Sequence, residues 1–305
     1  MNYQSQLKAI LKASAWTQEE LARRLSVSFA TLNAWVNARS HPRTKALEAI
    51  KILHLDIVGV DTIDVGELAV AKDAAMAMKT TLAAITKDTT TLDKLTLYLT
   101  YHTNTIEGST MTLADTDAVL FKHKVLTNRT QVEQAEARNH RAALLWLLEQ
   151  LENQDLVIDE QLVKGLHLRL MNGIMENAGR YRTHSVRIVG THVTVANYLK
   201  VPTLMSELFK EISRHSEDRI AMLATTHAAF EKIHPFSDGN GRVGRLILLA
   251  QALQAELIPP LVLKERRAAY YRYLEAAQTR DIDLPLQLFI AESMATTNQL
   301  LFESE

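Results

Sequence analysis

Residues 234 to 245 read His-Pro-Phe-Ser-Asp-Gly-Asn-Gly-Arg-Val-Gly-Arg, and this stretch decides how the rest of the chain is interpreted. The apolar periodicity before it predicts a helix that ends near His234, where Pro235 prevents simple continuation. The run Gly239-Asn-Gly241 then opens a second helix. A glycine-rich loop at the start of a helix presents free backbone N–H groups and the positive end of the helix dipole. The sequence therefore predicts an anion-binding loop between two helices.

The side chains of this loop have the chemistry that phosphate transfer requires. Asn240 adds an amide donor, and Arg242 and Arg245, three residues apart on one helix face, can clasp phosphate oxygens. Asp238 is the oxygen ligand that a phosphate-bound Mg²⁺ prefers, and His234 is the group that titrates near neutrality and can accept a proton. These parts favour nucleotidyl or phosphoryl transfer, in which catalysis depends on positioning and charge stabilisation.

The stretch resembles the Fic family signature at every fixed position. The resemblance implies a mainly α, Fic-type helical bundle that transfers AMP from ATP to a Ser, Thr or Tyr hydroxyl of a target protein or of itself. It implies roles for the following residues: His234 as the base, Asp238 as the Mg²⁺ ligand, Gly239, Asn240 and Gly241 as the anion hole, Arg242 and Arg245 as the grip on the distal phosphates, and Phe236 as a buried anchor. Relatives that use UTP or CDP-choline, or that act as kinases, leave the donor nucleotide open.

A second resemblance lies upstream of the loop. Ala178-Gly-Arg-Tyr-Arg182 precedes the β-branched run Val186–Val195, which predicts a short hairpin with Gly190 at its turn. It is similar to the family's flap, expected here at about residues 185–196, which docks the target by strand addition through Val189, Gly190 and Thr191. Thr194-Val-Ala196 replaces a Pro-Pro pair of many relatives, which leaves the choice of target open.

Downstream, Tyr270 and Tyr271 resemble the helix on the adenine side of the family's site. Gln278 stands where relatives more often have Asn. A stacked pair of core tyrosines is the alternative interpretation.

The segment Thr103-Asn-Thr-Ile-Glu107-Gly108 resembles the family's inhibitory motif, on a helix expected at about residues 91–108. A carboxylate delivered to Arg245 would form a charge-assisted pair and occupy the place that the ATP γ-phosphate needs. The alternative is an ordinary surface glutamate at the end of a helix. In some relatives this glutamate positions a water that removes AMP from the target, so de-AMPylation stays open.

The first 55 residues carry eight Lys or Arg against three Glu, a net charge of +5. Thr17, with Glu20 as its capping-box partner, and Ser28 predict two short helices, which resemble a Cro/repressor-type helix-turn-helix. Such a module would bind DNA, although protein contact or dimerisation is an alternative. The residues expected at the DNA are Gln18, Ser28, Phe29, Asn33, Arg39 and Arg43.

The amino-acid composition limits the structural class and the location that can be expected for this chain. With 10 glycines and 6 prolines in 305 residues, few tight turns are expected. No cysteine, no apolar run of membrane-spanning length and no signal-like N-terminus are present, which favours a cytoplasmic location. We expect a helix-turn-helix domain at 1–58, a connector at 59–90 and a Fic domain at 91–305, in a homodimer. The rival function is a transcription regulator whose Fic domain senses or dimerises.

Overall fold

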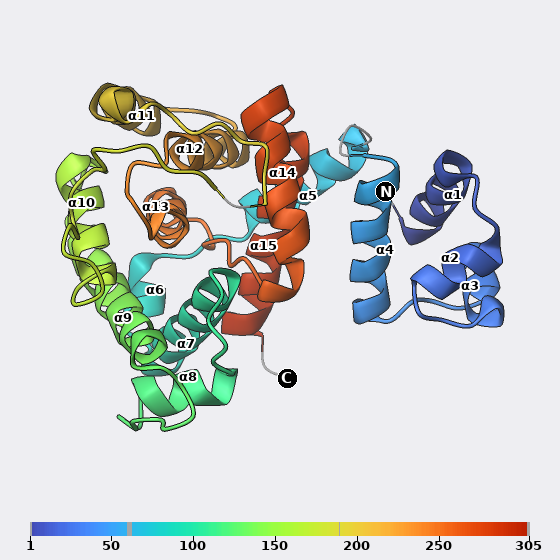
Figure 1. The fold of residues 1–305 in the computed structure, drawn as a ribbon, viewed down its shortest axis with the longest axis horizontal. Coiled ribbons are helices and arrows are strands. Elements are labelled where there is room, and N and C mark those ends of the chain that lie inside the picture. Colours follow the sequence, from blue (N-terminus) through green and yellow to red (C-terminus); the bar gives the residue numbers. More distant parts are fainter. Residues whose placement is uncertain (1, 60–62, 189, 304–305) are drawn as a thin grey trace.

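The structure is a computed structural model of the chain, and it describes residues 2–59, 63–188 and 190–303. Over these residues the chain is mainly helical, as predicted, with a small module beside a larger body (Figure 1). The small module contains four helices: α1 (Tyr3–Ser14), α2 (Gln18–Arg24), α3 (Phe29–Val36) and α4 (Thr44–Ile57).

The small module folds as its capping residues predict. The side chain of Thr17 accepts a hydrogen bond from the backbone N–H of Glu20, and Ser28 accepts one from Thr31. The predicted capping box is incomplete, because the Glu20 carboxylate pairs with Arg23 and Arg24 instead of bonding back to the backbone. The apolar faces of the four helices meet in a core of their own.

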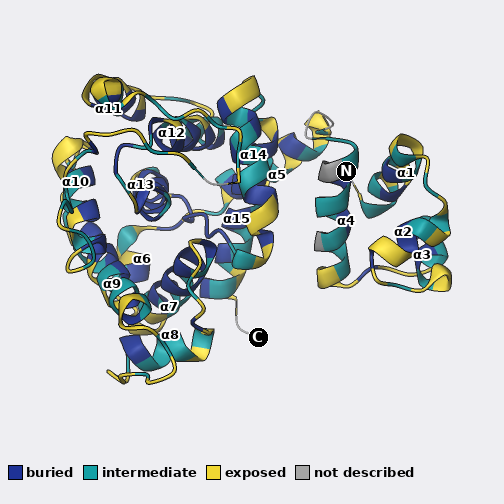
Figure 2. Cartoon of the chain, viewed as in Figure 1, coloured by how far each residue is buried: buried dark blue, intermediate teal, exposed yellow. Residues whose placement is uncertain are grey.

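The larger body is built around one central helix, α13 (Asn240–Gln254). Every residue from Arg242 to Leu253 is buried, as expected for a helix enclosed on all sides (Figure 2). Around it lie α7 (Thr89–Ile106), α9 (Gln131–Leu151), α10 (Glu160–Leu170), α11 (Val201–Ile212), α12 (Arg219–Ile233), α14 (Arg267–Arg280) and α15 (Leu284–Phe302). One apolar cluster joins α13 to α9, α10 and α11, and a second joins it to α12, α14 and α15.

Shorter elements complete the body: α5 (Val65–Ala77), α6 (Leu82–Thr86), α8 (Leu113–Leu120) and the 3₁₀ turns η1 (Tyr198–Lys200) and η2 (Lys264–Arg266). Helix α5 begins the connector and packs on α15, while α4 contacts α14. The ammonium of Lys51 in α4 lies 3.3 Å from the carboxylate of Glu292 in α15, so an ion pair also joins the module to the body. The domain boundaries at 58 and 90 stay predictions.

The predicted hairpin at 185–196 is not confirmed. Of this segment, residues 185–188 and 190–196 are described and contain no strand, while Val189 lies outside the described residues. The backbone N–H of His192 donates to the Glu275 carboxylate at 2.9 Å, and that of Ala196 donates to the Lys232 carbonyl at 3.2 Å. These amides therefore bond to α14 and α12 rather than to each other across a ladder.

Within the described ranges, no helix combines the length and the apolar character needed to cross a bilayer.

Candidate functional site

The loop between α12 and α13 is closed by its own side chains. Helix α12 ends at Ile233, and His234 adopts a left-handed backbone conformation with φ of 51°. The Asn240 side chain accepts from the N–H of Phe236 and donates to its carbonyl, both at 2.9 Å. The ring of Phe236 is fully buried, as expected for an anchor. Asn240 thus holds the loop closed with its amide instead of offering that amide to a ligand.

His167 of α10, a residue that sequence reasoning missed, supports the loop from below. Its ring stacks on Phe236 with 3.8 Å between the ring centroids. Its Nδ1 accepts from the N–H of Gly179 at 2.8 Å, so Nε2 carries the proton and donates to the carbonyl of Asp238 at 3.0 Å. Burial lowers the pKa of His167 to about 4, which keeps the ring neutral. Gly239, with φ of 77°, is needed here because a Cβ would lie 2.9 Å from the sulfur of Met171.

His234 has the geometry of a general base. Its Nδ1 lies 3.2 Å from the carbonyl of Glu231, an acceptor, so this nitrogen carries the proton and Nε2 keeps its lone pair. Burial lowers the pKa of His234, against a smaller opposing effect of the Glu231 carbonyl. The imidazole is therefore unprotonated at neutral pH and able to accept a proton.

Arg245 and Glu107 form an ion pair beside the start of α13. Helix α7 ends at Ile106, and Glu107 is its C-cap residue, followed by Gly108 with φ of 108°. The Glu107 carboxylate accepts a hydrogen bond from the guanidinium of Arg245, whose side chain is 3% exposed. A Cβ at Gly241 would collide with the same carboxylate, so the pair lies directly against the N-terminus of α13. Thr103 is buried one turn earlier in α7.

Arg242 does not share this position, although it is only three residues away. Its Nη1 lies 2.7 Å from the Glu136 carboxylate of α9, and its Nη2 lies 3.5 Å from Asp238. The two motif arginines therefore have different partners, and Arg242 ties α13 to α9. The Asp238 side chain is 65% exposed on the loop surface.

A cavity of about 1030 Å³ opens beside His234 and Arg245, which is at the upper end of the range for small-molecule sites. The predicted residues that line it are Glu107, Gly190, Thr191, His234, Gly241, Arg245, Tyr270, Tyr271 and Gln278. The structure places Thr103, Gly108, Asp238, Gly239, Asn240 and Arg242 outside this lining. The cavity thus joins the expected base, inhibitory glutamate, adenine-side helix and part of the flap.

The tyrosine pair forms one wall of the cavity from α14. The hydroxyl of Tyr270 lies 2.7 Å from Nε2 of His227, and the two tyrosine rings lie 5.2 Å apart. Gln278 donates to the carbonyl of Ala228 at 3.2 Å. The Tyr270 hydroxyl and the Gln278 amide are thereby bonded to α12. This wall therefore offers ring faces more than free hydrogen-bonding groups.

Glu231 is a further cavity residue that sequence reasoning missed. It is 5% exposed, and burial raises its pKa to about 8, which keeps the carboxyl neutral at pH 7. Its only signal in the sequence was its place three residues before His234, one helical turn away.

Two parts of this chain match known families. Residues 157–252 match the model of the Fic/DOC family. The chain carries a Fic domain. Residues 7–50, which lie within the module α1–α4, match a helix-turn-helix model.

Curated relatives of the Fic domain are similar over about two thirds of this chain. Protein adenylyltransferase Fic of Aedes aegypti is 30% identical over 207 residues, which cover 66% of this chain and 40% of that protein. Protein adenylyltransferase fic-1 of Caenorhabditis elegans is 33% identical over 194 residues, which cover 60% of this chain and 36% of that protein. The chain therefore spans less than half of the length of these relatives.

Solved structures share the fold. A Fic family protein from Desulfovibrio desulfuricans superposes with a TM-score of 0.62 and 26% identity, covering 77% of this chain and 74% of that one. Residues 134–508 of Fic-1 from Caenorhabditis elegans superpose with a TM-score of 0.66 and 23% identity, covering 96% of this chain and 86% of that one.

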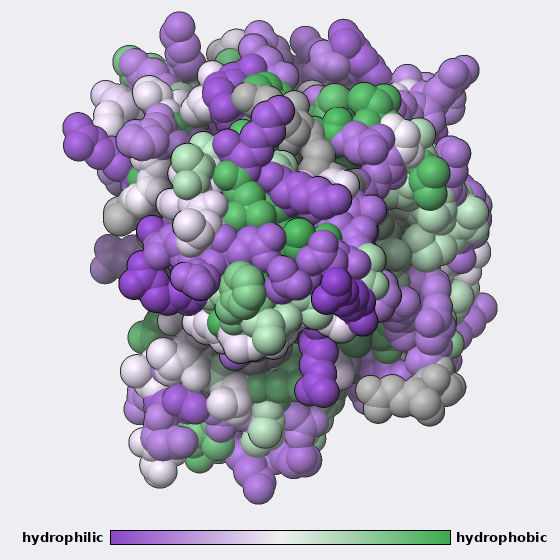
Figure 3. Space-filling model, turned by 90° about the vertical axis from the view of Figure 1, so that its right-hand side faces the viewer, coloured by the Kyte–Doolittle hydropathy of each residue, from purple (hydrophilic) through white to green (hydrophobic). Residues whose placement is uncertain are grey.

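The helix-turn-helix module beside the Fic domain exposes some of its predicted DNA contacts and occupies others. Phe29 is 48% exposed, and Arg39 and Arg43 are exposed. The amide of Asn33 donates to the side chain of Gln18 at 3.1 Å, so these two bond to each other. Ser28 caps α3. Figure 3 views the chain from the side of this module, where hydrophilic side chains cover most of the face, with small apolar patches between them.

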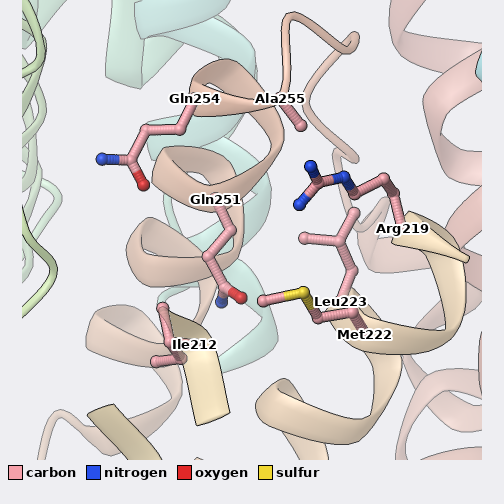
Figure 4. A pocket seen from close by; sticks show the side chains of 7 residues that line it. All are labelled: Ile212, Arg219, Met222, Leu223, Gln251, Gln254 and Ala255. Atoms are coloured by element: carbon pink, nitrogen blue, oxygen red, sulfur yellow. The ribbon is translucent and has the colours of Figure 1, made fainter. Parts of the chain in front are cut away.

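A second, smaller cavity of about 80 Å³ lies at the opposite ends of α12 and α13 (Figure 4). Its lining consists of Ile212, Arg219, Met222, Leu223, Gln251, Gln254 and Ala255, and includes no predicted site residue. The Gln251 side chain is bonded to Thr226 at 3.0 Å, within the packing of the two helices. We assign no role in the Fic site to this cavity.

Proposed function

We propose that this chain is a protein adenylyltransferase that moves AMP from ATP to a hydroxyl side chain and that Glu107 holds it inactive. The observation that carries the proposal is the pairing of Glu107 with Arg245 inside the cavity that also contains His234. The names of the curated relatives, protein adenylyltransferase, support the same reaction class.

The chemistry follows from the groups around the cavity. The target hydroxyl oxygen attacks the α-phosphorus of ATP, the bond to the β-phosphate oxygen breaks, and pyrophosphate leaves. Nε2 of His234 accepts the hydroxyl proton, since Nδ1 is bonded to the carbonyl of Glu231. The backbone N–H groups at the start of α13, at Asn240 and Gly241, stabilise the negative charge on the phosphates. Arg245 binds the distal phosphates once Glu107 has left it.

Magnesium fits the donor set of the loop. In the part of the chain that the structure describes, no group of three or more His, Asp or Glu side chains is arranged to hold a metal ion. Mg²⁺ is commonly bound by one or two carboxylates together with substrate phosphates and water. Asp238, 65% exposed beside the phosphate-binding end of α13, suits that arrangement. We propose that it holds Mg²⁺ with the α- and β-phosphates, where the ion would neutralise charge on the leaving group.

Inhibition follows from competition for one guanidinium. As long as Glu107 pairs with Arg245, the γ-phosphate has no access to that cation, and ATP binds in a pose unsuited to attack. An error of about 1 Å in the reacting geometry costs on the order of 100-fold in rate. Unmodified protein should therefore show little transfer.

The decisive experiment is the intact mass of the Glu107→Gly protein after incubation with ATP and Mg²⁺. We expect a gain of one AMP, abolished by adding His234→Ala. Glu152→Gly is a matched control, because Glu152 is the exposed C-cap residue of α9 and does not line the cavity. No incorporation by Glu107→Gly with ATP, UTP or CDP-choline would refute the proposal. Loss of AMP from a modified target with the wild-type chain would add the reverse activity.

A second function is favoured by the basic module. Its +5 charge, the helix-turn-helix match and the exposure of Arg39 and Arg43 support DNA binding. We propose that a homodimer binds an operator through two such modules. A gel shift on the DNA upstream of the coding sequence, at low and moderate salt, tests this. Absence of a shift even at low salt would argue for a protein-contact role instead.

A further inference from the structure

Arg182 makes an unusual set of contacts beside the loop. It lies between α10 and η1 and is 2% exposed. Each hydrogen bond that the structure gives its guanidinium goes to a backbone carbonyl, those of residues 184, 196, 233 and 234. A buried arginine is usually matched by a carboxylate, so carbonyls in this number indicate that the side chain organises backbone.

Two of these carbonyls belong to the end of α12. Nε of Arg182 donates to the carbonyl of His234 at 2.7 Å, and Nη2 donates to that of Ile233 at 3.3 Å. The backbone N–H of Arg182 also donates to the carbonyl of Pro235 at 2.9 Å. The negative end of the helix dipole attracts a cation here. His234 is held in a left-handed conformation that is unfavourable for a residue other than glycine, and the bond to its carbonyl stabilises that conformation.

The other two carbonyls bracket the flap segment. Nη1 donates to the carbonyl of His184 at 2.9 Å, and Nη2 donates to the carbonyl of Ala196. One planar guanidinium therefore holds both ends of the 185–195 segment and, on its other edge, the backbone of His234. Among standard side chains only arginine has five donors fixed in one plane, so lysine cannot reproduce these four contacts.

We propose that Arg182 is the positioning residue that sets the catalytic base and the target-docking segment in register. Arg182 is not among the residues that line the cavity. It acts through the carbonyls of His234, His184 and Ala196. This inference rests on the proposed transferase function, because it assigns the base to His234 and target docking to residues 185–195.

The consequence is a defect in transfer without a defect in nucleotide binding. Arg182 does not line the cavity, so its replacement leaves the phosphate-binding groups in place. In the Glu107→Gly background, Arg182→Lys should lower kcat for self-modification by about 10- to 100-fold, the cost of a displacement of an ångström or less. The KM for ATP should change less than about twofold, because the contacts that bind ATP equally in the ground state and the transition state are unchanged.

The test uses the full chain with Glu107→Gly, Glu107→Gly/Arg182→Lys and Glu107→Gly/Arg180→Lys. Arg180 is exposed two residues away and is the matched control. Incorporation of ATP labelled at the α-phosphate gives kcat and KM. Hydrogen exchange followed by peptide mass gives a readout that does not need activity. We expect faster exchange of residues 183–197 and 231–238 together in Arg182→Lys, and unchanged exchange in Arg180→Lys.

Two results would overturn the proposal: equal kcat for the Arg182→Lys and Arg180→Lys proteins, or exchange that rises in only one of the two segments. If Glu107→Gly itself incorporates nothing, the transferase function fails, and the exchange experiment alone decides whether Arg182 couples the segments. Arg182→Ala with added guanidinium chloride separates positioning from folding. Recovery of transfer at millimolar guanidinium, with an unchanged melting temperature, is expected, and no recovery in a folded protein contradicts the proposal.

Discussion

Replacing Glu107 by glutamine removes one charge from the cavity while keeping the size of the side chain. Arg245 then remains as a cation whose side chain is 3% exposed, with its carboxylate partner gone. Breaking a fully buried pair in this way costs about 3–5 kcal/mol, whereas an exposed pair is worth about 1 kcal/mol or less. Because Glu107 is 29% exposed, we expect an intermediate loss of about 2 kcal/mol in the free energy of unfolding.

ATP should reverse this loss, because its phosphates supply the missing negative charge. In the wild type the nucleotide must compete with Glu107 for Arg245, whereas in the variant it meets an unpaired guanidinium. A difference of about 2 kcal/mol corresponds to roughly 30-fold tighter binding by Glu107→Gln. Thermal unfolding with and without ATP and Mg²⁺ measures both effects. We expect a melting temperature about 4 °C below wild type without nucleotide, and a larger upward shift on adding ATP.

The control is Glu152→Gln, which removes an exposed carboxylate from the C-cap of α9 and should behave as wild type. The reasoning is refuted if Glu107→Gln melts with the wild type and gains the same shift from ATP. That result would mean that the Arg245 pair neither stabilises the chain nor competes with the nucleotide.

Three further predictions concern the base, the anchor and the buried histidines. Because burial lowers the pKa of His234, transfer by the Glu107→Gly protein should lose rate only as the pH falls below 6.5, as a pH–rate profile would show. Phe236→Ala should lower the free energy of unfolding by about 3–5 kcal/mol in urea titrations, since the ring is fully buried. Four buried histidines, His102, His140, His167 and His227, with pKa values of about 4, 3, 4 and 3, stay neutral when folded and take up protons when unfolded below pH 6.5. Stability should thus fall by about 1 kcal/mol for each between pH 7.5 and 5.5, measured in a Glu231→Gln background to remove the opposing titration of that carboxyl.

The sequence predicted best those features that local chemistry determines. Proline after His234 and the Gly-Asn-Gly run predicted the helix-loop-helix, which the structure has, and the caps at Thr17 and Ser28 predicted α2 and α3. These features depend on residues within one or two turns of each other, so a single sequence is enough to find them.

Contacts distant in sequence were the ones that could not be predicted. Arg242 has a helical spacing that favours a joint phosphate clasp with Arg245, yet Glu136, 106 residues away, takes its guanidinium. His167 supports the loop from 71 residues away. The β-branched run at 186–195 predicted a hairpin, but the backbone N–H of His192 donates to Glu275 of α14, and that of Ala196, directly after the run, donates to Lys232 of α12. In each case tertiary packing supplied a partner that overrode the local pattern.

The enclosure of α13 on every side has a thermodynamic consequence for ligand binding. The packing of the helix already orders the amides at its N-terminus. A phosphate that binds there therefore causes little further loss of conformational entropy in the protein backbone. The conformational entropy lost on binding must then come from the ligand, the end of α7 and the segment at 185–196. Differences in nucleotide affinity between variants of this chain should therefore originate in those surrounding parts, while the helix itself contributes a constant enthalpic term.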